Sequence, residues 1–293
     1  MKPSDEAPIF VVGAQRSGTT LVRLILTSHP SIAIPPEGDF LLDLAGHFER
    51  AALASPDGTS FVDQFFEIPK CAEWGLDRRE LARRIEQVRP ATYADLAAIP
   101  YQLYGEMAFG AGKPRWGDKN PYYVLYLDQL LSIYPRARVV VVVRDPRDVT
   151  ASVLPLHFGP TTAADAVLDW LFAARAANAA RSRWGNIVRQ VRYEDVATRT
   201  EEEALDLCDH VGETFDASML EFHRINEEAC LVPRHRHGWH AGTVKPAFSS
   251  SVGRFTRDLL PQEVLVTELF AGAAMVAHGY ERRLLSTIFG LPG

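Results

Sequence analysis

The sequence contains few cysteines and no excess of positive charge. Three of its 293 residues are cysteines, Cys71, Cys208 and Cys230, which lie far apart and form no C-x-x-C pair. Reduced thiols with a structural role, in a cytoplasmic protein, are therefore expected rather than a disulfide framework. The formal net charge of −6 argues against a nucleic-acid-binding protein that depends on overall positive charge.

Long apolar runs are also missing. No stretch reaches about 18 residues without a charged side chain, so no membrane span is predicted. Residues 1–8 are polar and acidic and lead directly into an apolar run, which is not the pattern of a signal peptide. With 47% hydrophobic and 23% charged residues, the chain has a globular composition, and we predict one domain over residues 1–293 in the cytoplasm.

Short β-branched runs alternate with amphipathic segments. The runs at residues 9–12, 139–143 and 187–191 predict buried strands, the second being five consecutive valines. Helices follow each run, which predicts an α/β fold with a central parallel sheet flanked by helices. Residues 40–112 are predicted to form a helical cap over an acceptor, and residues 230–258 a polar C-terminal lid. Extended pieces are predicted at 31–34 and 113–119, and further helices near 40–53, 78–88, 92–107, 122–134, 161–183, 201–210, 217–227 and 261–278.

The chain opens on a strand, a loop and a helix that together suit an anion. Gly13 and Gly18 bound a loop that carries Arg16 and Ser17 before an amphipathic segment begins. Backbone N–H groups at the start of a helix lack intrahelical partners and, with the helix dipole, attract negative charge. The spacing fits the first half of a phosphate-binding loop, G-x-x-x-x-G-K-[ST], but Thr19 stands where the lysine should be.

A second anion-binding group follows the valine run. That strand ends in Arg144, and Asp145 with Pro146 behind it is typical of a helix N-cap. A nucleoside triphosphatase needs a loop lysine and a carboxylate for Mg²⁺, so an ATP- and Mg²⁺-dependent phosphotransferase (a P-loop kinase) is the weaker interpretation. A ligand with two separate anionic ends, bound without metal, fits these residues better.

Five motifs occur in an order that points to one family. They are GAQRSGTTL at residues 13–21, GDKNP at 117–121, VVVVVRDPRDVTAS at 139–152, VRYEDV at 191–196, and VKP with SVGRF within 244–255. Together they resemble the sulfotransferases that use 3′-phosphoadenosine 5′-phosphosulfate (PAPS). The resemblance implies the P-loop-like sulfotransferase fold, PAPS as the donor, and adenosine 3′,5′-bisphosphate (PAP) as the product.

The resemblance also implies which residues bind the nucleotide. In the family the first loop cradles the 5′-phosphosulfate, a strand-end arginine and a serine after it bind the 3′-phosphate, and a tyrosine lies near the adenine. A further loop closes over the nucleotide. By position, the residues implied are Arg16, Ser17, Gly18, Thr19 and Thr20 in the first loop, Arg144 and Ser152 for the 3′-phosphate, Tyr193 near the adenine, and Lys245 and Arg254 in the closing loop.

A general base is implied in the same way. With Arg16 in R-S-G-T-T and the run H-P-S-I-A-I-P-P-E that ends at Glu37, the chain is similar to the tyrosylprotein-sulfotransferase-like branch. This implies that Glu37 takes the acceptor proton, that Arg16 stabilises the bridging and sulfuryl oxygens, and that Lys119 stabilises the transferring group or the leaving phosphate. His157, placed after Ser152 on the same predicted helix, and His47 stay open as alternative bases.

The predicted reaction is transfer of a sulfuryl group from PAPS to a hydroxyl of a sugar, lipid, small molecule or peptide, without a metal. A nucleotide-binding protein that has lost catalysis is a further alternative. A zinc site at Cys230, His235, His237 and His240 is not expected, because arginines interleave the histidines. Aromatic residues of the cap either line an acceptor pocket or form core; they are Phe40, Phe48, Phe61, Phe65, Phe66, Trp74, Tyr101 and Tyr104.

Overall fold

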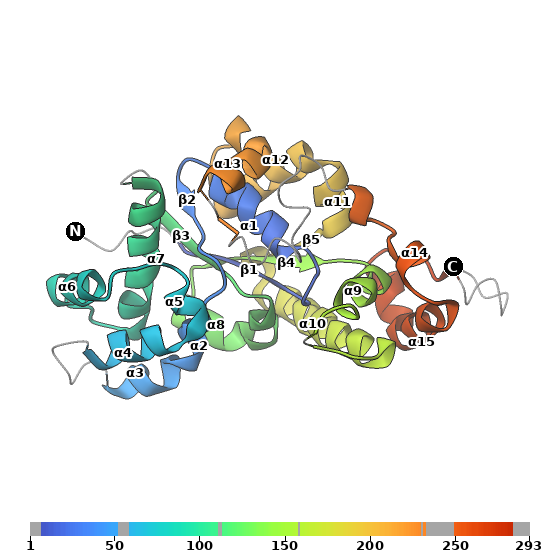
Figure 1. Cartoon of the computed structure of the whole chain (residues 1–293), viewed down its shortest axis with the longest axis horizontal. Helices are drawn as coiled ribbons and strands as arrows, with labels where there is room; N and C mark the ends of the chain where they lie inside the picture. Colours follow the sequence, from blue (N-terminus) through green and yellow to red (C-terminus); the bar gives the residue numbers. More distant parts are fainter. Residues whose placement is uncertain are drawn as a thin grey trace.

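A five-stranded parallel sheet forms the centre of the protein in a computed structural model, which describes residues 7–51, 59–110, 113–157, 159–229, 231–232 and 249–283. The strand order is β2-β3-β1-β4-β5, and each neighbouring pair is parallel. The strands are β1 (Ile9–Gly13), β2 (Ile32–Ala33), β3 (Arg115–Lys119), β4 (Arg138–Val143) and β5 (Val188–Arg192). Figure 1 shows helices above and below this sheet, which confirms the predicted α/β class.

The register of the strands brings the predicted motifs to one edge. Val11 of β1 pairs with Lys119 on one side and with Val140 on the other. Val143 of β4 pairs with Arg192, the last residue of β5. Because all strands run the same way, the loops that follow them meet at the carboxyl edge of the sheet, where ligands bind in open α/β folds.

Helices bury both faces of the sheet. One face carries α1 (Thr19–Ser28), α11 (Tyr193–Thr198), α12 (Thr200–Val211), η4 (Ala217–Glu221) and α13 (Phe222–Ala229). The other carries η2 (Pro121–Tyr126), α8 (Leu127–Ile133), α9 (Pro146–Val153), α10 (Ala163–Trp184) and α15 (Pro261–Ala277), with η3 (Gly185–Ile187) leading into β5. The short elements η7 (Ser249–Ser251) and α14 (Phe255–Asp258) precede α15.

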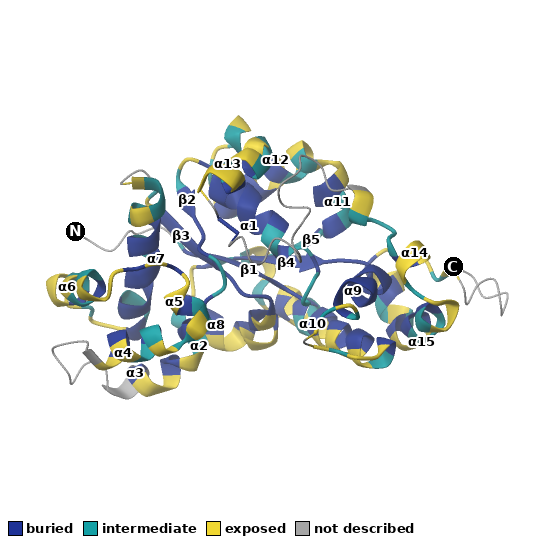
Figure 2. Cartoon of the chain, viewed as in Figure 1, coloured by how far each residue is buried: buried dark blue, intermediate teal, exposed yellow. Residues whose placement is uncertain are grey.

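The valines of β4 explain why both faces are covered. Val140 and Val142 belong to the apolar cluster under α1, whereas Val139, Val141 and Val143 belong to the cluster under α10. Side chains alternate across a strand, so an uninterrupted apolar run requires a packed layer on each side. Figure 2 shows the strands and the inward helix faces as buried.

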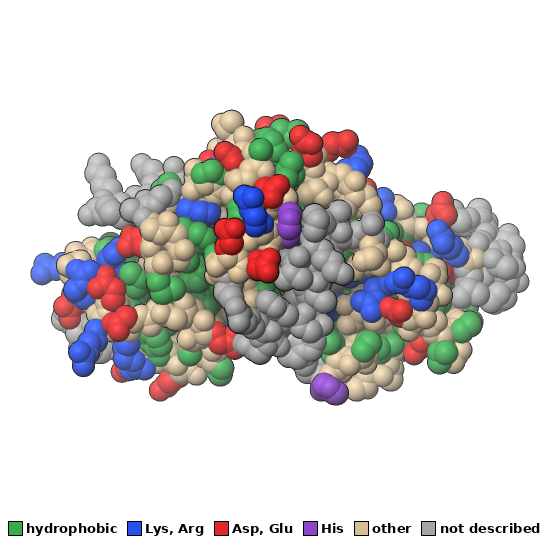
Figure 3. All heavy atoms as spheres, turned by 45° about the horizontal axis from the view of Figure 1, so that its top comes forward, with side chains coloured by type: hydrophobic (Ala, Val, Ile, Leu, Met, Phe, Trp, Pro, Cys, Tyr) green, Lys and Arg blue, Asp and Glu red, His purple; other side chains and the backbone are tan. Residues whose placement is uncertain are grey.

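The predicted cap forms one end of the molecule. It consists of α2 (Phe40–Asp43), α3 (Ala45–Ala51), α4 (Thr59–Glu67), α5 (Pro69–Ala72), α6 (Arg78–Val88) and α7 (Tyr93–Phe109). Acidic and basic side chains intermingle on its outer surface at the left of Figure 3. Among the exposed ion pairs of the cap, Arg78 pairs with Asp63 at 2.5 Å. The charged helix faces are therefore solvated surface.

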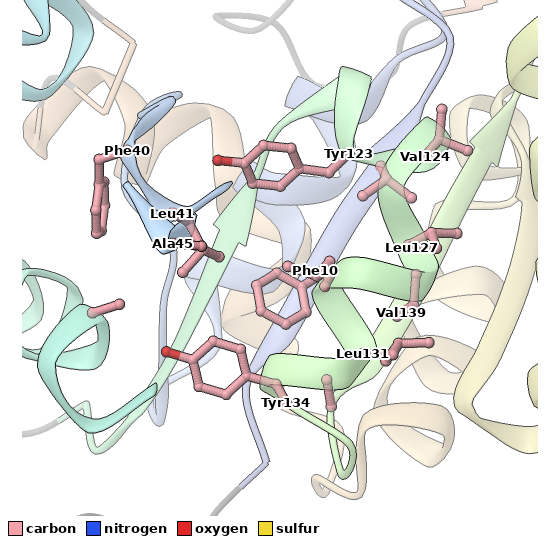
Figure 4. Close-up of a cluster of buried hydrophobic side chains, with 14 of the residues drawn as sticks. Phe10, Phe40, Leu41, Ala45, Tyr123, Val124, Leu127, Leu131, Tyr134 and Val139 are labelled. Atoms are coloured by element: carbon pink, nitrogen blue, oxygen red, sulfur yellow. The ribbon is translucent and has the colours of Figure 1, made fainter. Parts of the chain in front are cut away.

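Most of the cap aromatics form a core. The Phe40 ring lies 5.0 Å from Phe65, 5.8 Å from Trp74 and 5.2 Å from Tyr101, measured between ring centroids. These four side chains are at most 2% exposed, so they do not line an open pocket. In Figure 4 this cluster continues from Phe40 to Phe10 of the sheet, which joins the cap firmly to the strands.

Several predicted elements differ in detail from the structure. The helix predicted at 122–134 is the 3₁₀ segment η2 followed by α8, because Asn120 caps a turn that starts with Pro121. The helix predicted at 40–53 is split between α2 and α3, and the extended piece at 31–34 pairs only over Ile32–Ala33. Among the described residues no helix is both long and apolar enough to span a membrane.

Candidate active site

The loop after β1 shapes the N-terminus of α1 as an anion site. Gly18 adopts φ of 103° at the N-cap, a conformation that favours glycine, and a Cβ there would lie 2.3 Å from the Tyr193 ring. Thr19 and Thr20 then begin α1, whose first N–H groups have no intrahelical acceptors. The Ser17 hydroxyl is buried and has no hydrogen-bond partner in the described part of the chain.

Arginine side chains from distant segments converge on this loop. Arg16 Nε donates to Ser152 Oγ at 3.1 Å. Arg144 donates to the carbonyl oxygens of Arg16 at 3.1 Å and of Ser251 at 2.6 Å, and its guanidinium lies 4.4 Å from the centre of the Tyr193 ring. The structure thus brings together the predicted loop, the strand-end arginine, the serine and the tyrosine.

Electrostatics identify Arg254 as a further member of this group. The pKa of Arg16 is lowered to about 10, first by burial and then by the positive charges of Arg144 and Arg254, while Glu37 acts in the opposite direction. We call Arg16, Arg144 and Arg254 the guanidinium cluster. Arg144 is buried, whereas the Arg254 side chain is 29% exposed and pairs with Asp258 at 2.7 Å. Repulsion between cations is relieved by a bound anion, so the cluster suits a ligand rich in negative charge.

Glu37 meets Lys119 at the neighbouring position of the sheet edge. Lys119 Nζ, on the last residue of β3, lies 2.5 Å from Glu37 Oε1. Burial lowers the pKa of Lys119, and the charge of Glu37 opposes that shift. The turn that carries Glu37 is held by two side chains from other segments. The Trp74 indole N–H donates to the backbone carbonyl of Glu37 at 3.5 Å, and the Tyr123 hydroxyl donates to the backbone carbonyl of Asp39 at 3.2 Å.

Sequence patterns gave no role to three side chains near Glu37, which are Lys70, Asp39 and Asn120. Lys70 of α5 lies 3.5 Å from Glu37 Oε2 and 3.0 Å from Asp39 Oδ2. Asn120 donates to Asp39 Oδ1 at 2.9 Å. We call Glu37, Lys119, Lys70 and Asp39 the base cluster. Asn120 was within a quoted motif, but no local signal marks Lys70, because it comes from the cap.

Comparison with known proteins then gives the family. A sequence model of the sulfotransferase family matches residues 8–217, which is more than half of the chain. The chain belongs to the sulfotransferase family. The resemblance of the five motifs is thereby confirmed at the level of the family.

Two curated relatives show how far this similarity extends. The chain is 28% identical to nodulation protein NoeE of Sinorhizobium fredii, over 94% of the chain and 66% of that protein. It is 27% identical to the Caenorhabditis briggsae "Putative protein-tyrosine sulfotransferase", over 51% of the chain and 43% of that protein. The chain spans less than two thirds of the length of either relative. Since the second match covers half of the chain, the tyrosylprotein-like branch stays a prediction.

Solved structures agree on the fold. The sulfotransferase domain of the Synechococcus olefin synthase superimposes with a TM-score of 0.60 at 22% identity, covering 92% of this chain and 98% of that one. The domain from the curacin biosynthetic pathway gives 0.60 at 20% identity, covering 95% and 99%. The predicted sulfotransferase fold is therefore confirmed.

In this member of the sulfotransferase family, a buried carboxylate attaches the C-terminal segment to the site. Asp148 accepts hydrogen bonds from the backbone N–H groups of Gly253 at 2.8 Å and Phe255 at 3.0 Å. These contacts set Arg254 beside α9. Asp148 is the second aspartate of the R-D-P-R-D motif, and its role was not inferred from the sequence.

Asp145 acts as the predicted cap. Its carboxylate accepts from the backbone N–H of Arg147 at 2.9 Å and from the guanidinium of the same residue at 2.6 Å. Arg147 also pairs with Glu268 of α15 at 2.7 Å. This carboxylate is therefore used in joining α9 to the C-terminal helix.

The histidines named as alternative bases lie on exposed surface. His157 is beyond the end of α9 at Val153, so its predicted place on the same helix as Ser152 is wrong. His47 lies with Nδ1 3.1 Å from Gln64 Oε1 on the cap surface. His29, the first residue of the run that ends at Glu37, contacts the backbone carbonyl of Thr214 through Nε2 at 2.8 Å. This is a structural contact.

Part of the predicted lid is outside the described residues. This applies to Lys245 and to the cysteine and histidines weighed as zinc ligands, Cys230, His235, His237 and His240. Within the described ranges, no three His, Cys, Asp or Glu side chains group as metal ligands. Cys71 and Cys208 are buried free thiols, and burial raises the pKa of Cys71 to about 12.

Proposed function

We propose that this protein transfers a sulfuryl group from PAPS to a hydroxyl of an acceptor, with Glu37 as the general base. The observation that supports this most is the convergence of Arg16, Ser152 and Arg144 at the N-terminus of α1, with Glu37 paired to Lys119 at the end of the neighbouring strand. A donor with two anionic ends needs such a cationic site, and an alcohol needs a base within reach.

The side chains present fit the donor. Arg144 Nε and Ser17 Oγ are buried without partners in the described part of the chain, and such atoms commonly await a ligand or water. We assign the 5′-phosphosulfate to the loop residues Arg16, Ser17, Gly18, Thr19 and Thr20, and the 3′-phosphate to Arg144 and Ser152. Tyr193, Arg254 and Lys245 are assigned to the adenine side and the lid.

The proposed chemistry is an in-line transfer. The acceptor oxygen attacks sulfur, the bond from sulfur to the 5′-phosphate oxygen breaks, and its electron pair leaves with PAP. Glu37 receives the hydroxyl proton, which is within the role of a carboxylate whose environment is partly buried. Arg16 and Lys119 stabilise the negative charge that develops on the sulfuryl and bridging oxygens.

Replacement of the base tests catalysis. Release of PAP from PAPS is measured with a sugar, a fatty alcohol, a phenol and a tyrosine peptide as acceptors. Glu37→Gln is expected to lower acceptor-dependent release by about 10²–10⁴-fold, the usual contribution of a general base. Asp63→Asn, on the exposed cap surface, serves as the control. Turnover that survives in Glu37→Gln would remove the base role, and no release with any acceptor would favour a non-catalytic relative.

Ligand-dependent melting tests the donor. PAP with a chelator present is expected to raise the melting temperature, whereas a response only to ATP with Mg²⁺ would contradict the proposal and favour a phosphotransferase. Arg254→Ala should weaken the PAP effect. Arg257→Ala is the matched control, because Arg257 lies in α14, the helix that Arg254 caps, and bonds the Ser250 carbonyl at 3.3 Å.

A further inference from the structure

Glu37 lies between two lysine side chains that come from different parts of the chain. Lys119 of the sheet approaches Oε1 at 2.5 Å, and Lys70 of the cap approaches Oε2 at 3.5 Å. The Lys119 side chain is 6% exposed and that of Lys70 is 34% exposed. Glu37 is therefore held on one side by a buried cation of the sheet and on the other by a partly exposed cation of the cap.

Lys70 is held closer to a second carboxylate than to Glu37. Its ammonium donates to Asp39 Oδ1 at 3.1 Å and lies 3.0 Å from Oδ2. Asn120, directly after β3, donates to the same Oδ1 at 2.9 Å. Asp39 is thus tied to the sheet, and it draws the ammonium of Lys70 away from a short contact with Glu37.

We propose that Lys70 is a positioning residue for the base: held by Asp39, it orients the Glu37 carboxylate toward the acceptor and couples that carboxylate to the cap. This inference rests on the proposed function, in which Glu37 is the base. A carboxylate oxygen accepts more than one hydrogen bond, so the long contact with Lys70 is compatible with a further bond from an acceptor hydroxyl.

Charge changes at the two neighbours act on Glu37 in opposite directions. Loss of the Lys70 ammonium removes a stabilising cation, which raises the pKa of Glu37. Loss of the Asp39 charge removes a like charge and releases Lys70 toward Glu37, which lowers that pKa. The other charged or titratable groups that act on Glu37 from the packed elements stay in place in both variants; they are Arg16, Asp118, Lys119 and Tyr122.

The titration of Glu37 tests this directly. The protein is labelled with ¹³C at glutamate carboxyl groups, and the Glu37 signal is assigned by its loss in Glu37→Gln. We expect the Glu37 titration midpoint to rise by about 0.5–1 pH unit in Lys70→Met and to fall by about as much in Asp39→Asn. These shifts are small for neighbouring charges because the side chains of Lys70, Glu37 and Asp39 are all partly exposed to water. Lys70→Arg keeps the charge and should restore the native midpoint.

Arg78→Met is the matched control, because it removes a cap cation whose partner is Asp63 on the outer surface. It should leave the midpoint unchanged. A midpoint that does not move in Lys70→Met, or that moves the same way in Lys70→Met and Asp39→Asn, would overturn the positioning role. The titration needs neither PAPS nor an acceptor, so its failure is distinct from failure of the proposed function, which the turnover of Glu37→Gln decides.

Discussion

At the start of α1, the guanidinium groups of Arg16, Arg144 and Arg254 repel one another, whereas around Glu37 cations and carboxylates alternate. In the guanidinium cluster, the charges of Arg144 and Arg254 add to burial in lowering the pKa of Arg16. In the base cluster, Lys119 and Lys70 each lie within 3.5 Å of a carboxylate oxygen of Glu37. Both clusters occupy the same carboxyl edge of one sheet.

The difference teaches that the two clusters are suited to different steps. Cations held close together are stabilised when an anion joins them, so the guanidinium cluster is suited to binding. The base cluster is largely neutralised by its own side chains, and a carboxylate between two cations responds to small changes in either one. Its two ammonium groups and two carboxylates balance in charge, so the base cluster offers no excess of positive charge to a phosphate.

The largest expected effect is a loss of folding stability when the loop beside the guanidinium cluster is overfilled. Gly18→Ala places a Cβ 2.3 Å from the Tyr193 ring at φ of 103°. Strain and overpacking together should lower the free energy of unfolding by about 2–5 kcal/mol. In Gly253→Ala, φ is 70° but nothing lies within 4 Å of the added Cβ, so the loss should be about 1–2 kcal/mol. Equal losses in chemical denaturation would show that the contact with Tyr193 is unimportant.

The next effect separates the two clusters by ligand affinity. Arg144→Met removes charged hydrogen bonds and should weaken PAP binding by about 10–100-fold in calorimetry. Lys70→Met should change the same affinity by less than about threefold, because Lys70 belongs to the base cluster. The melting temperature without ligand controls for loop damage, since Arg144 also bonds the Ser251 carbonyl. Similar losses of PAP affinity in Arg144→Met and Lys70→Met would show that the two clusters do not differ in ligand binding.

The last prediction concerns the pH dependence of stability and Asp118, the buried neighbour of Lys119 in β3. Burial raises the pKa of Asp118 to about 7, although the Tyr101 hydroxyl and Lys119 act against the shift. The folded state therefore keeps a proton that the unfolded state loses near pH 4, and stability falls as the pH rises from about 4 to about 7, by at most about 1.4 kcal/mol per pH unit.

Asp118→Asn should flatten this pH dependence in denaturation curves, since the amide does not titrate in that window. Asp63→Asn, which removes an exposed carboxylate on the cap, should retain the native slope. If the slope of the unfolding free energy against pH is unchanged in Asp118→Asn, groups other than Asp118 cause the pH dependence.

Much of the guanidinium side was predictable from the sequence. Arg16, Ser152 and Arg144 belong to contiguous motifs, and the structure joins them within 3.1 Å. The base side was predictable only for Glu37 and Lys119, which also lie in motifs. The end of α9 at Val153, which leaves His157 outside the helix, could not be placed from the periodicity.

The sequence by itself determined the strands, the anion-binding loop and the motif residues, because these depend on periodicity and on neighbours along the chain. Tertiary structure alone decided that Lys70 joins Asp39 across 31 positions and that Asp148 fixes Gly253 across 105. It also decided that the cap aromatics form a core. The physical reason is that such contacts arise when separate helices pack on the sheet, and no local pattern encodes which side chains then meet.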